Sequence, residues 1–482
     1  MPEKIAIIGA GVGGLSTAIR LAYNGYNVEV LEKLSQCGGR NNLLEDKGFK
    51  FDMGPSFVLM PDFFYEIFNY CHKNINDYLD LEIIDPSYII FYPDGRKLTV
   101  YKDTDKTKDE LERFEKNADI KFEAFIKETA RLYNTIKPLL YNCFSTKDIL
   151  NPTYWPLLGK IRVLDSYWKL AKKFFKSEEL LYALTFEAMF MGVSPFDAPA
   201  LYSIISYADH IQKIFHPMGG MYTIPKALEN IAKELKVKFI FNTEVKNITK
   251  RNNEIILEAN NWQEKFDRLI INADYAYSQE TLLRRNLPNY KYSCSVYLLY
   301  LGLKEKIEGL AHHNLFFSSN LRENLNDIFN KKETPHDPSF YVHVPTFTDS
   351  SLAPKNKEIL YILIPVANLE KNPTNFSERE YYLRKIVFEK INRIIGKNLE
   401  NLIEVEHRFY PHDFIQRYNI KYGATFGLSH NLTQSAFFRP TNFDRKIKNI
   451  YYVGASTQPG GGLPPVIASS KIVTDLILKS QR

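Results

Sequence analysis

The chain has 482 residues, of which 45% are hydrophobic and 24% are charged, a composition that excludes an intrinsically disordered protein and allows for two or three subdomains. Its 62 basic and 56 acidic residues give a net charge of +6, too small for a dedicated nucleic-acid-binding protein, so we expect no nucleic-acid partner. The four cysteines lie far apart without a C-x-x-C pair, which excludes a disulfide scaffold and a zinc ribbon and fits a reducing compartment. Aromatic residues make up 14%, which indicates either an aromatic-rich core or a large apolar site.

The N-terminus shows no targeting signal. The sequence begins MPEKIAIIGAG, without the charged and apolar regions of a signal peptide. No window offers the ~20 uninterrupted apolar residues of a membrane span. We therefore expect neither export nor a spanning helix.

The first 32 residues contain the most informative pattern. An apolar run at residues 4–8 leads into a G-x-G-x-x-G loop, then a helical pattern over 14–23, and a second strand ends at Glu32. Such a loop presents helix N-terminal N–H groups to phosphates, and the acidic residue accepts hydrogen bonds from ribose hydroxyls. A simple glycine-rich turn is the alternative, but the strand and helix on either side favour a dinucleotide site. Its expected residues are Gly9, Ala10, Gly11, Gly13, Gly14, Glu32 and Lys33.

Two further loops follow and indicate which dinucleotide binds. Gly38-Gly39-Arg40 comes shortly after Glu32, and a strand-like segment at 49–52 leads into a second loop at 53–56. An exposed turn would explain Gly-Gly-Arg alone, but in this position the arginine can neutralise a pyrophosphate from its other side. Flavoproteins that enclose FAD need such a loop, whereas nicotinamide enzymes do not. We therefore predict FAD, with Gly38, Gly39, Arg40, Gly54, Pro55 and Ser56 as further contacts.

The C-terminal end supplies the matching half of the predicted cofactor site. A buried strand at 448–453 runs into a glycine-rich loop at 454–465, and a helical pattern covers 466–478. Proline just before a helix, fed by such a loop, again aims backbone N–H groups at an acceptor. Residues 237–243 and 268–272 read as two more strands of the same sheet. The remaining predicted contacts are Val245, Gly454, Ala455, Leu463, Pro464 and Val466.

Several motifs in one ordered series carry a family resemblance. The series comprises FDMGPS (51–56) with Met60-Pro61, LYSII (201–205), HPMGGMY (216–222), YSCS (292–295), DPSFY (337–341), SLAP (351–354), FRPTN (438–442) and GAST (454–457). With this series and the N-terminal loop, the chain resembles the bacterial carotenoid desaturases of the phytoene desaturase family, and most closely the diapophytoene (dehydrosqualene) desaturases. The resemblance implies FAD, an amine-oxidase-like or p-hydroxybenzoate-hydroxylase-like two-domain fold, and stepwise desaturation of a colourless polyene. One departure is Gln458, where the family usually has histidine.

The expected fold class is α/β. We expect an FAD-binding Rossmann-type domain assembled from three chain segments, with an inserted α+β substrate domain and a helical membrane-associating region. The predicted cofactor segments are 1–85, 215–290 and 441–482, and the predicted substrate segments are 86–214, which includes the helical region, and 291–440.

No convincing catalytic constellation is visible, so catalytic residues beyond the flavin stay unknown. Ser456 lacks an evident His/Asp pairing, and His312-His313, His407 and His412 lack metal-ligand spacing, so we predict no metal site. A cofactor that carries the hard chemistry leaves positioning and water exclusion to the protein. A polyene hydrocarbon must be held by buried apolar area, for which we expect lining from Tyr182, Phe186, Met189, Phe190, Met191, Tyr202 and Ile204.

A substrate that partitions into bilayers calls for contact with a membrane surface. The best candidate is the segment 154–176, which mixes two tryptophans and other apolar residues with six basic residues. The alternative is an amphipathic helix packed inside the inserted domain, with its lysines merely solvated. We expect a monotopic, peripheral protein on the cytoplasmic side of the cell membrane, with quinone or oxygen as a possible electron acceptor. Three other functions stay open: a carotenoid isomerase, an amine-oxidase-like flavoenzyme, or a non-catalytic escort of prenylated partners.

Overall fold

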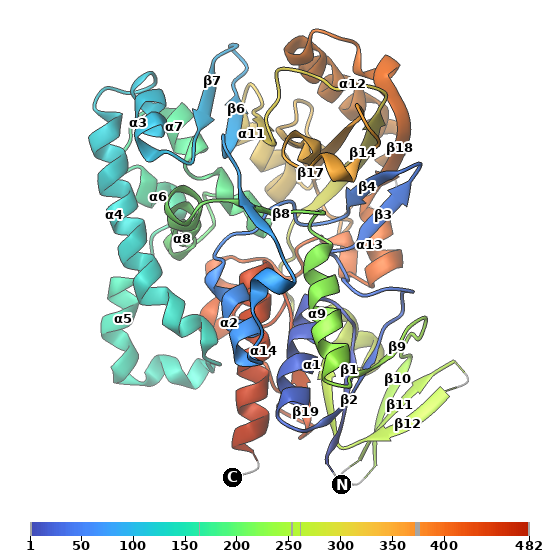
Figure 1. Ribbon diagram of the computed structural model, residues 1–482. Helices are drawn as coiled ribbons and strands as arrows, with labels where there is room; N and C mark the ends of the chain where they lie inside the picture. The colour runs from blue at the N-terminus through green and yellow to red at the C-terminus, as the bar shows by residue number, and fades with distance from the viewer. Residues whose placement is uncertain (1, 163, 252–253, 261, 372–375, 481–482) are drawn as a thin grey trace.

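The computed structural model describes residues 2–162, 164–251, 254–260, 262–371 and 376–480. Figure 1 shows a parallel sheet near the two termini, a second sheet at the opposite end of the molecule, and a layer of helices along one side. The overall architecture is therefore mixed α/β.

The parallel sheet is built from strands that are distant in sequence. Its order is β19-β13-β1-β2-β9, and every neighbouring pair is parallel. Helices α1, α9 and α14 pack beside it, and α1 contacts both of the others. The strands predicted at 237–243, 268–272 and 448–453 are confirmed as members of this sheet. The elements are β1 (Lys4–Ile8), α1 (Val12–Tyr23), β2 (Asn27–Leu31), α9 (Thr223–Glu234), β9 (Lys238–Ile240), β13 (Arg268–Ile271), β19 (Ile450–Tyr452) and α14 (Leu463–Lys479).

The second sheet has seven strands in the order β18-β14-β17-β16-β15-β6-β7. Its neighbours are antiparallel except β15 and β6, which run parallel. The turn at Pro93-Asp94-Gly95 connects the antiparallel strands β6 and β7, and α12 covers one face through Leu383, Val387 and Ile391. The elements are β6 (Tyr88–Phe91), β7 (Lys97–Val100), β14 (Ser295–Leu303), β15 (His313–Phe316), β16 (Phe340–His343), β17 (Glu358–Val366), α12 (Phe376–Ile395) and β18 (Ile403–Phe409).

The helical layer comes from the middle of the chain. Long helix α4 runs along its outer side, and short helices fill the space between it and the second sheet (Figure 1). Apolar residues of this layer form one cluster with strands β6 and β7. The helices are α3 (Thr104–Glu112), α4 (Ala118–Ile136), α5 (Trp155–Lys160), α6 (Tyr167–Ala171), α7 (Glu178–Ala183) and α8 (Ile204–Tyr207).

Smaller elements join these regions. A three-stranded antiparallel sheet, β10-β11-β12, extends from the parallel sheet, and two-stranded pairs form between β3 and β4 and between β5 and β8. The elements are β3 (Leu43–Asp46), β4 (Phe49–Asp52), α2 (Asp62–Tyr70), β5 (Leu81–Ile83), β8 (Phe215–Pro217), β10 (Asn247–Arg251), β11 (Glu254–Ala259), β12 (Trp262–Phe266), α10 (Tyr275–Tyr277), α11 (Leu321–Asn326) and α13 (Pro411–Tyr418).

The segment 154–176 does not form one amphipathic helix. Helix α5 ends before Arg162, whose φ of +52° breaks the helical path, and α6 begins only at Tyr167. Trp168 is buried between the rings of Tyr182 and Phe196, with centroids 4.8 and 4.7 Å away. The expectation that both tryptophans face a membrane is therefore wrong for Trp168, because aromatic packing inside the helical layer takes up its ring. Within the described part of the chain, no helix has the length and hydrophobicity needed to cross a bilayer.

Candidate functional site

One cavity of about 620 Å³ connects the parallel sheet, the second sheet and the helical layer. Every site residue predicted above lines this cavity except Ala10 and Gly14. The backbone N–H of Ala10 donates to Glu32, and Gly14 packs against the preceding loop, so both shape the wall from behind. The three predicted glycine loops, which are residues 9–14 (first), 38–40 (second) and 454–465 (third), thus come together in space.

The first glycine loop connects β1 to α1. Gly9 has φ +98°, and a Cβ on Gly14 would lie 2.1 Å from the Gly9 carbonyl oxygen, so the helix can approach the loop only with glycine there. Among the described residues, no side chain caps α1 at Gly11, and its first turn holds no acidic residue. The N–H groups of that turn are therefore available to an anion at the helix N-terminus.

Glu32 lies at the end of β2, and its carboxylate contacts the same loop. Oε2 accepts from the Ala10 N–H at 2.7 Å and Oε1 accepts from the Leu34 N–H at 2.9 Å. Burial raises the pKa of Glu32, and these backbone donors oppose the rise. A carboxylate has further lone pairs, so Glu32 can still accept from hydroxyl groups in the cavity.

The second loop runs alongside the first. The Gly38 N–H donates to the Ala10 carbonyl at 2.8 Å, and a Cβ on Gly39 would lie 3.2 Å from the Cα of Gly11. Arg40 follows in the cavity wall, where Nη1 donates to the Thr425 carbonyl at 2.8 Å. Burial lowers the pKa of Arg40 and the charge of Asp274 opposes this effect, so the guanidinium stays a cation in the wall.

Lys33 lies at the same end of the cavity, but its amine binds protein groups. Nζ donates to the Gln416 carbonyl at 2.9 Å and to Asn419 Oδ1 at 3.0 Å, and it lies 3.6 Å from Glu244. Lys33 therefore holds the C-terminal end of α13 against this end of the cavity.

The third loop reaches the cavity from the C-terminal side. Helix α14 begins at Leu463, three residues earlier than the pattern predicts, because proline is tolerated in the first turn of a helix. Gly462 precedes it at φ +97°. Behind the loop, Nε2 of buried His430 accepts from the Gly461 N–H at 2.9 Å. The loop is therefore fixed by a side chain from a distant segment.

At position 458, where the family usually has histidine, the glutamine side chain bonds two distant segments. Its side-chain oxygen accepts from the Phe144 N–H at 2.6 Å, and its Nε2 donates to the Phe144 carbonyl at 2.8 Å and to the Arg439 carbonyl at 3.2 Å. A side-chain amide can accept from the N–H and donate to the carbonyl of the same residue simultaneously. Gln458 therefore links the C-terminal loop to the helical layer.

The rest of the cavity is apolar. All seven side chains predicted to line a hydrocarbon site face this one space, and Ile205, Leu315, Phe317 and Leu325 add to them from the helices and the second sheet. Ring pairs stiffen the wall: the centroids of Phe57 and Phe190 are 4.9 Å apart, and those of Phe186 and Phe190 are 5.4 Å apart. A polar cradle at one end thus continues into an apolar compartment.

Comparison with known proteins agrees with this geometry. The model of the flavin containing amine oxidoreductase family matches residues 12–478. The chain belongs to this family. The zeta-carotene-forming phytoene desaturase of Myxococcus xanthus is 37% identical over 488 residues, covering 99% of this chain and 94% of the relative. The 4,4'-diapophytoene desaturase (4,4'-diaponeurosporene-forming) of Staphylococcus aureus (strain Newman) is 33% identical, covering 99% of both chains.

A solved structure supports the fold alone. Cyclohexylamine oxidase from Brevibacterium oxydans IH-35A is 14% identical with a TM-score of 0.63, and the match covers 100% of both chains. The resemblance to carotenoid desaturases is therefore confirmed by sequence, whereas the likeness to an amine oxidase concerns only the fold of the flavin family.

The residues present fit FAD, the cofactor of this flavoprotein family. The two adjoining glycine loops leave no room for Cβ atoms, the N-terminus of α1 offers free N–H groups, and Arg40 supplies a cation nearby. Glu32 suits ribose hydroxyls and the third loop suits the ring end. The individual contacts stay predictions.

Some residues of this flavoprotein site escape sequence inspection. Asn272 donates from Nδ2 to the Gly9 carbonyl at 3.1 Å, and Asp274, Tyr418, Thr425 and His430 also line the cavity. They come from the loop after β13, from the end of α13 and from the chain after it, none of which contains a dinucleotide motif. Asn272 ends the strand predicted at 268–272 and Asp274 follows it, so the end of a predicted strand of the sheet is the signal that could have found them.

Proposed function

We propose that this protein is an FAD-dependent carotenoid desaturase, which introduces C=C bonds into a colourless polyene precursor. The observation that carries the proposal is the continuity of the glycine cradle with a large aromatic and aliphatic compartment. The relatives that match over the whole chain are named as desaturases of phytoene and diapophytoene. A hydrocarbon has no polar group to bind, so its affinity must come from such apolar walls, at about 25 cal/mol per Å².

Desaturation removes two hydrogens from an allylic –CH2–CH2– unit and leaves a C=C bond. Bound flavin supplies the acceptor for one hydrogen with its electron pair. The other hydrogen leaves as a proton from the adjacent carbon, and the polyene itself delocalises the positive charge. The protein must then align the chain and exclude water, which is what the packed rings of Phe57, Phe186 and Phe190 can do.

The proposal covers both C30 and C40 substrates. The relative at 37% identity is named for phytoene, a C40 polyene, and the relative at 33% identity is named for diapophytoene, a C30 polyene. Chain-length choice then depends on the depth of the apolar compartment rather than on a polar contact.

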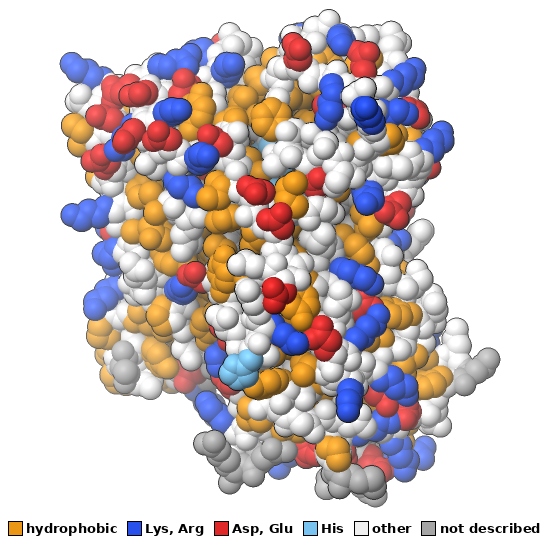
Figure 2. Space-filling view, in the orientation of Figure 1, with side chains coloured by type: hydrophobic (Ala, Val, Ile, Leu, Met, Phe, Trp, Pro, Cys, Tyr) orange, Lys and Arg blue, Asp and Glu red, His pale blue; other side chains and the backbone are white. Residues whose placement is uncertain are grey.

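We also propose that the protein binds a membrane surface, and that the part of the protein in contact with the membrane lies around α5. Leu150, Trp155 and Leu164 are 78, 60 and 86% exposed, whereas Leu157 and Ile161 of the same region line the cavity. Figure 2 shows apolar side chains among lysines and arginines over this lower part of the helical layer. An apolar surface next to the cavity wall is where a substrate dissolved in a bilayer would enter.

Flotation with anionic liposomes tests this surface. Trp155→Ser combined with Leu164→Ser should release the protein from vesicles while flavin stays bound. Tyr381→Ser with Tyr382→Ser is the matched control, because both side chains are about as exposed but lie on α12, at 67 and 66%. Unchanged vesicle binding in the α5 variant, or equal loss in the control, would contradict the proposed surface.

The activity is tested by incubating the flavin-loaded protein with diapophytoene or phytoene in liposomes and recording the absorbance spectrum. A desaturase produces new absorption at longer wavelength, since each added double bond extends the conjugated system. An isomerase leaves the number of conjugated bonds unchanged, an amine oxidase releases hydrogen peroxide with amines instead, and a prenyl-lipid escort purifies without flavin. Supplying oxygen or a quinone in separate assays identifies the terminal electron acceptor.

A further inference from the structure

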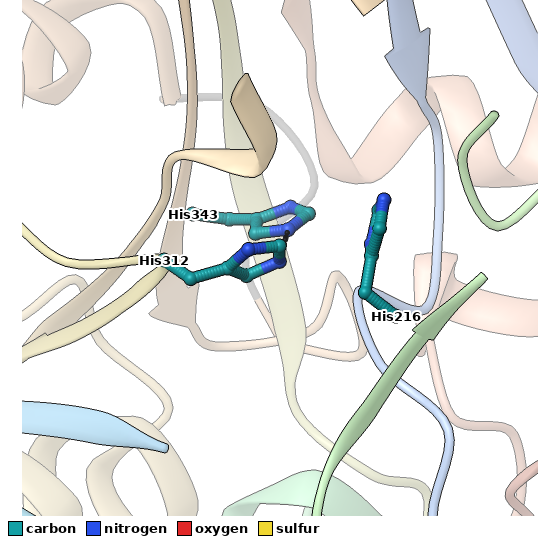
Figure 3. Close-up of side chains that lie close together, drawn as sticks. All are labelled: His216, His312 and His343. Carbon is teal, nitrogen blue, oxygen red and sulfur yellow. Dashed lines mark hydrogen bonds between the residues drawn. The ribbon is translucent and has the colours of Figure 1, made fainter. Parts of the chain in front are cut away.

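Three histidines that are far apart in the sequence lie together in the interior. His216 comes from β8, His312 directly precedes β15, and His343 ends β16 (Figure 3). All three are buried, and one ring nitrogen from each lies within 4.8 Å of the other two. The Nε2 atoms of His312 and His343 are 3.0 Å apart. Inspection of sequence spacing missed this cluster because each histidine is carried by a different strand region.

His216 lacks the hydrogen bonds that a buried imidazole requires. Among the described residues, neither of its ring nitrogens has a hydrogen-bond partner, although the side chain is 0% exposed. The nearest carboxylate oxygen, Oδ2 of Asp349, is 3.5 Å from Nε2, too far for a well-formed hydrogen bond. Figure 3 shows the His216 ring facing the pair formed by His312 and His343. A ligand between the three rings would satisfy it.

The other two histidines also direct ring nitrogens at the cluster. His312 and His343 are both buried, and their Nε2 atoms form a hydrogen bond with each other. His312 Nδ1 lies 2.7 Å from Oγ1 of Thr348, which leaves Nε2 directed at the cluster. A hydrogen bond from the second ring nitrogen is the usual way in which a metal-binding histidine is oriented.

We propose that His216, His312 and His343 bind one zinc ion, with Asp349 beside them as the counter-charge. Imidazole nitrogen suits zinc at about 2.0–2.1 Å, and tetrahedral binding places the nitrogens about 3.3 Å apart. The Nε2 atoms of the His312–His343 pair, 3.0 Å apart, are already near that separation, and the ring nitrogen of His216, which lies within 4.8 Å of theirs, must approach by up to about 1.5 Å. The expected ligand set is three neutral nitrogens and one carboxylate or water.

The site has a structural role in the wall of the cavity. Of the residues described as lining the cavity, none is a member of the cluster, so the ion would not meet the substrate. Strand β16 also carries Tyr341, whose hydroxyl donates to Ser56 Oγ at 2.8 Å in the cavity wall. Zinc would therefore tie β8 to β15 and β16 and fix the wall beside Ser56.

A second buried cluster serves as the internal control. Glu187, Asp209 and His210 also converge, and both carboxylate oxygens of Asp209 lack partners among the described residues. Burial raises the pKa of Asp209 to about 7 and that of Glu187 well above its ordinary value. Two such carboxyl groups can satisfy each other by sharing a proton, whereas the His216 ring lies beside two further imidazoles and 3.5 Å from the Asp349 carboxylate. We therefore assign the metal to the histidine cluster.

The test is the zinc content of untagged, flavin-loaded protein. The protein is purified from cells grown with zinc and dialysed, and the metal is measured by elemental mass spectrometry. Wild type should hold about one zinc per chain, and His216→Ala and His343→Ala should each lower this about tenfold or more, while Asp209→Asn keeps it. Wild type without zinc, zinc retained in both histidine variants, or zinc lost only in Asp209→Asn would each overturn the proposal.

A milder variant covers the case in which the histidine variants fail to fold. Thr348→Val removes only the hydrogen bond at His312 Nδ1 and should weaken zinc binding about tenfold in competition with a chelator. Zinc affinity equal to wild type in this variant would contradict the assignment. The chelator should also lower the Tm of wild type, and an unchanged Tm would contradict the structural role.

Discussion

Replacing Arg40 by alanine tests the cofactor cradle most sharply. The guanidinium lies in the cavity wall next to the two glycine loops, where it donates to the Thr425 carbonyl and neighbours Asp274. A hydrogen bond to a charged group contributes about 1.5–3 kcal/mol, so losing one to the pyrophosphate weakens FAD binding about 10- to 150-fold. The uncompensated charge of Asp274 favours the upper end of this range.

Stability should fall with affinity. If FAD is present at about a thousand times its Kd, it stabilises the fold by about 4 kcal/mol, and this contribution falls to about 1–3 kcal/mol in Arg40→Ala. The assay is flavin retention after dialysis, with the Tm recorded with and without added FAD. Arg113→Ala is the matched control, since Arg113 is an exposed arginine paired with Glu110 at 2.8 Å. Full flavin retention in Arg40→Ala would refute the role of the second loop.

Three further variants test separate parts of the account. Gly14→Ala should abolish FAD binding, because its Cβ would lie 2.1 Å from the Gly9 carbonyl oxygen; a yellow, stable variant would contradict this. Burial raises the pKa of Asp52 to about 6, so its contribution to stability is present below about pH 4 and is lost as the pH rises through 6, by up to about 3 kcal/mol. The free energy of unfolding, measured with urea at about pH 4 and above pH 6, should fall less between the two pH values for Asp52→Asn than for wild type. Equal falls in the two proteins would contradict this role of Asp52. Gln458→His should lower the free energy of unfolding by about 1–3 kcal/mol with flavin retained, because an imidazole cannot bond the N–H and the carbonyl of Phe144 together; unchanged stability would count against that link.

Local patterns predicted the cofactor half of the molecule well. The strand, glycine loop and helix around Gly9–Gly14 depend on neighbours in sequence. Buried parallel strands such as β13 and β19 also carry continuous apolar runs, which can be recognised from the local sequence alone. These parts need no knowledge of the rest of the fold.

Contacts between distant segments were beyond sequence reasoning. His430 behind the third loop and Thr425 opposite Arg40 come from a region without a motif, and only the folded chain brings them to the cavity. Trp168 lies in a segment that mixes apolar and basic residues, but its side chain is buried, because tertiary packing against Phe196 overrides the local pattern. The three clustered histidines illustrate the same limit.

Anaerobic single turnover tests directly whether the bound flavin accepts the hydrogen removed from a polyene. Flavin-loaded protein is mixed with excess diapophytoene or phytoene in liposomes without any electron acceptor, and flavin absorbance and product spectrum are followed together. We expect bleaching of the flavin in step with one new double bond per flavin, for at least one of the two polyenes. A flavin that stays oxidised with both polyenes, or a polyene that changes while the flavin does not, would contradict it.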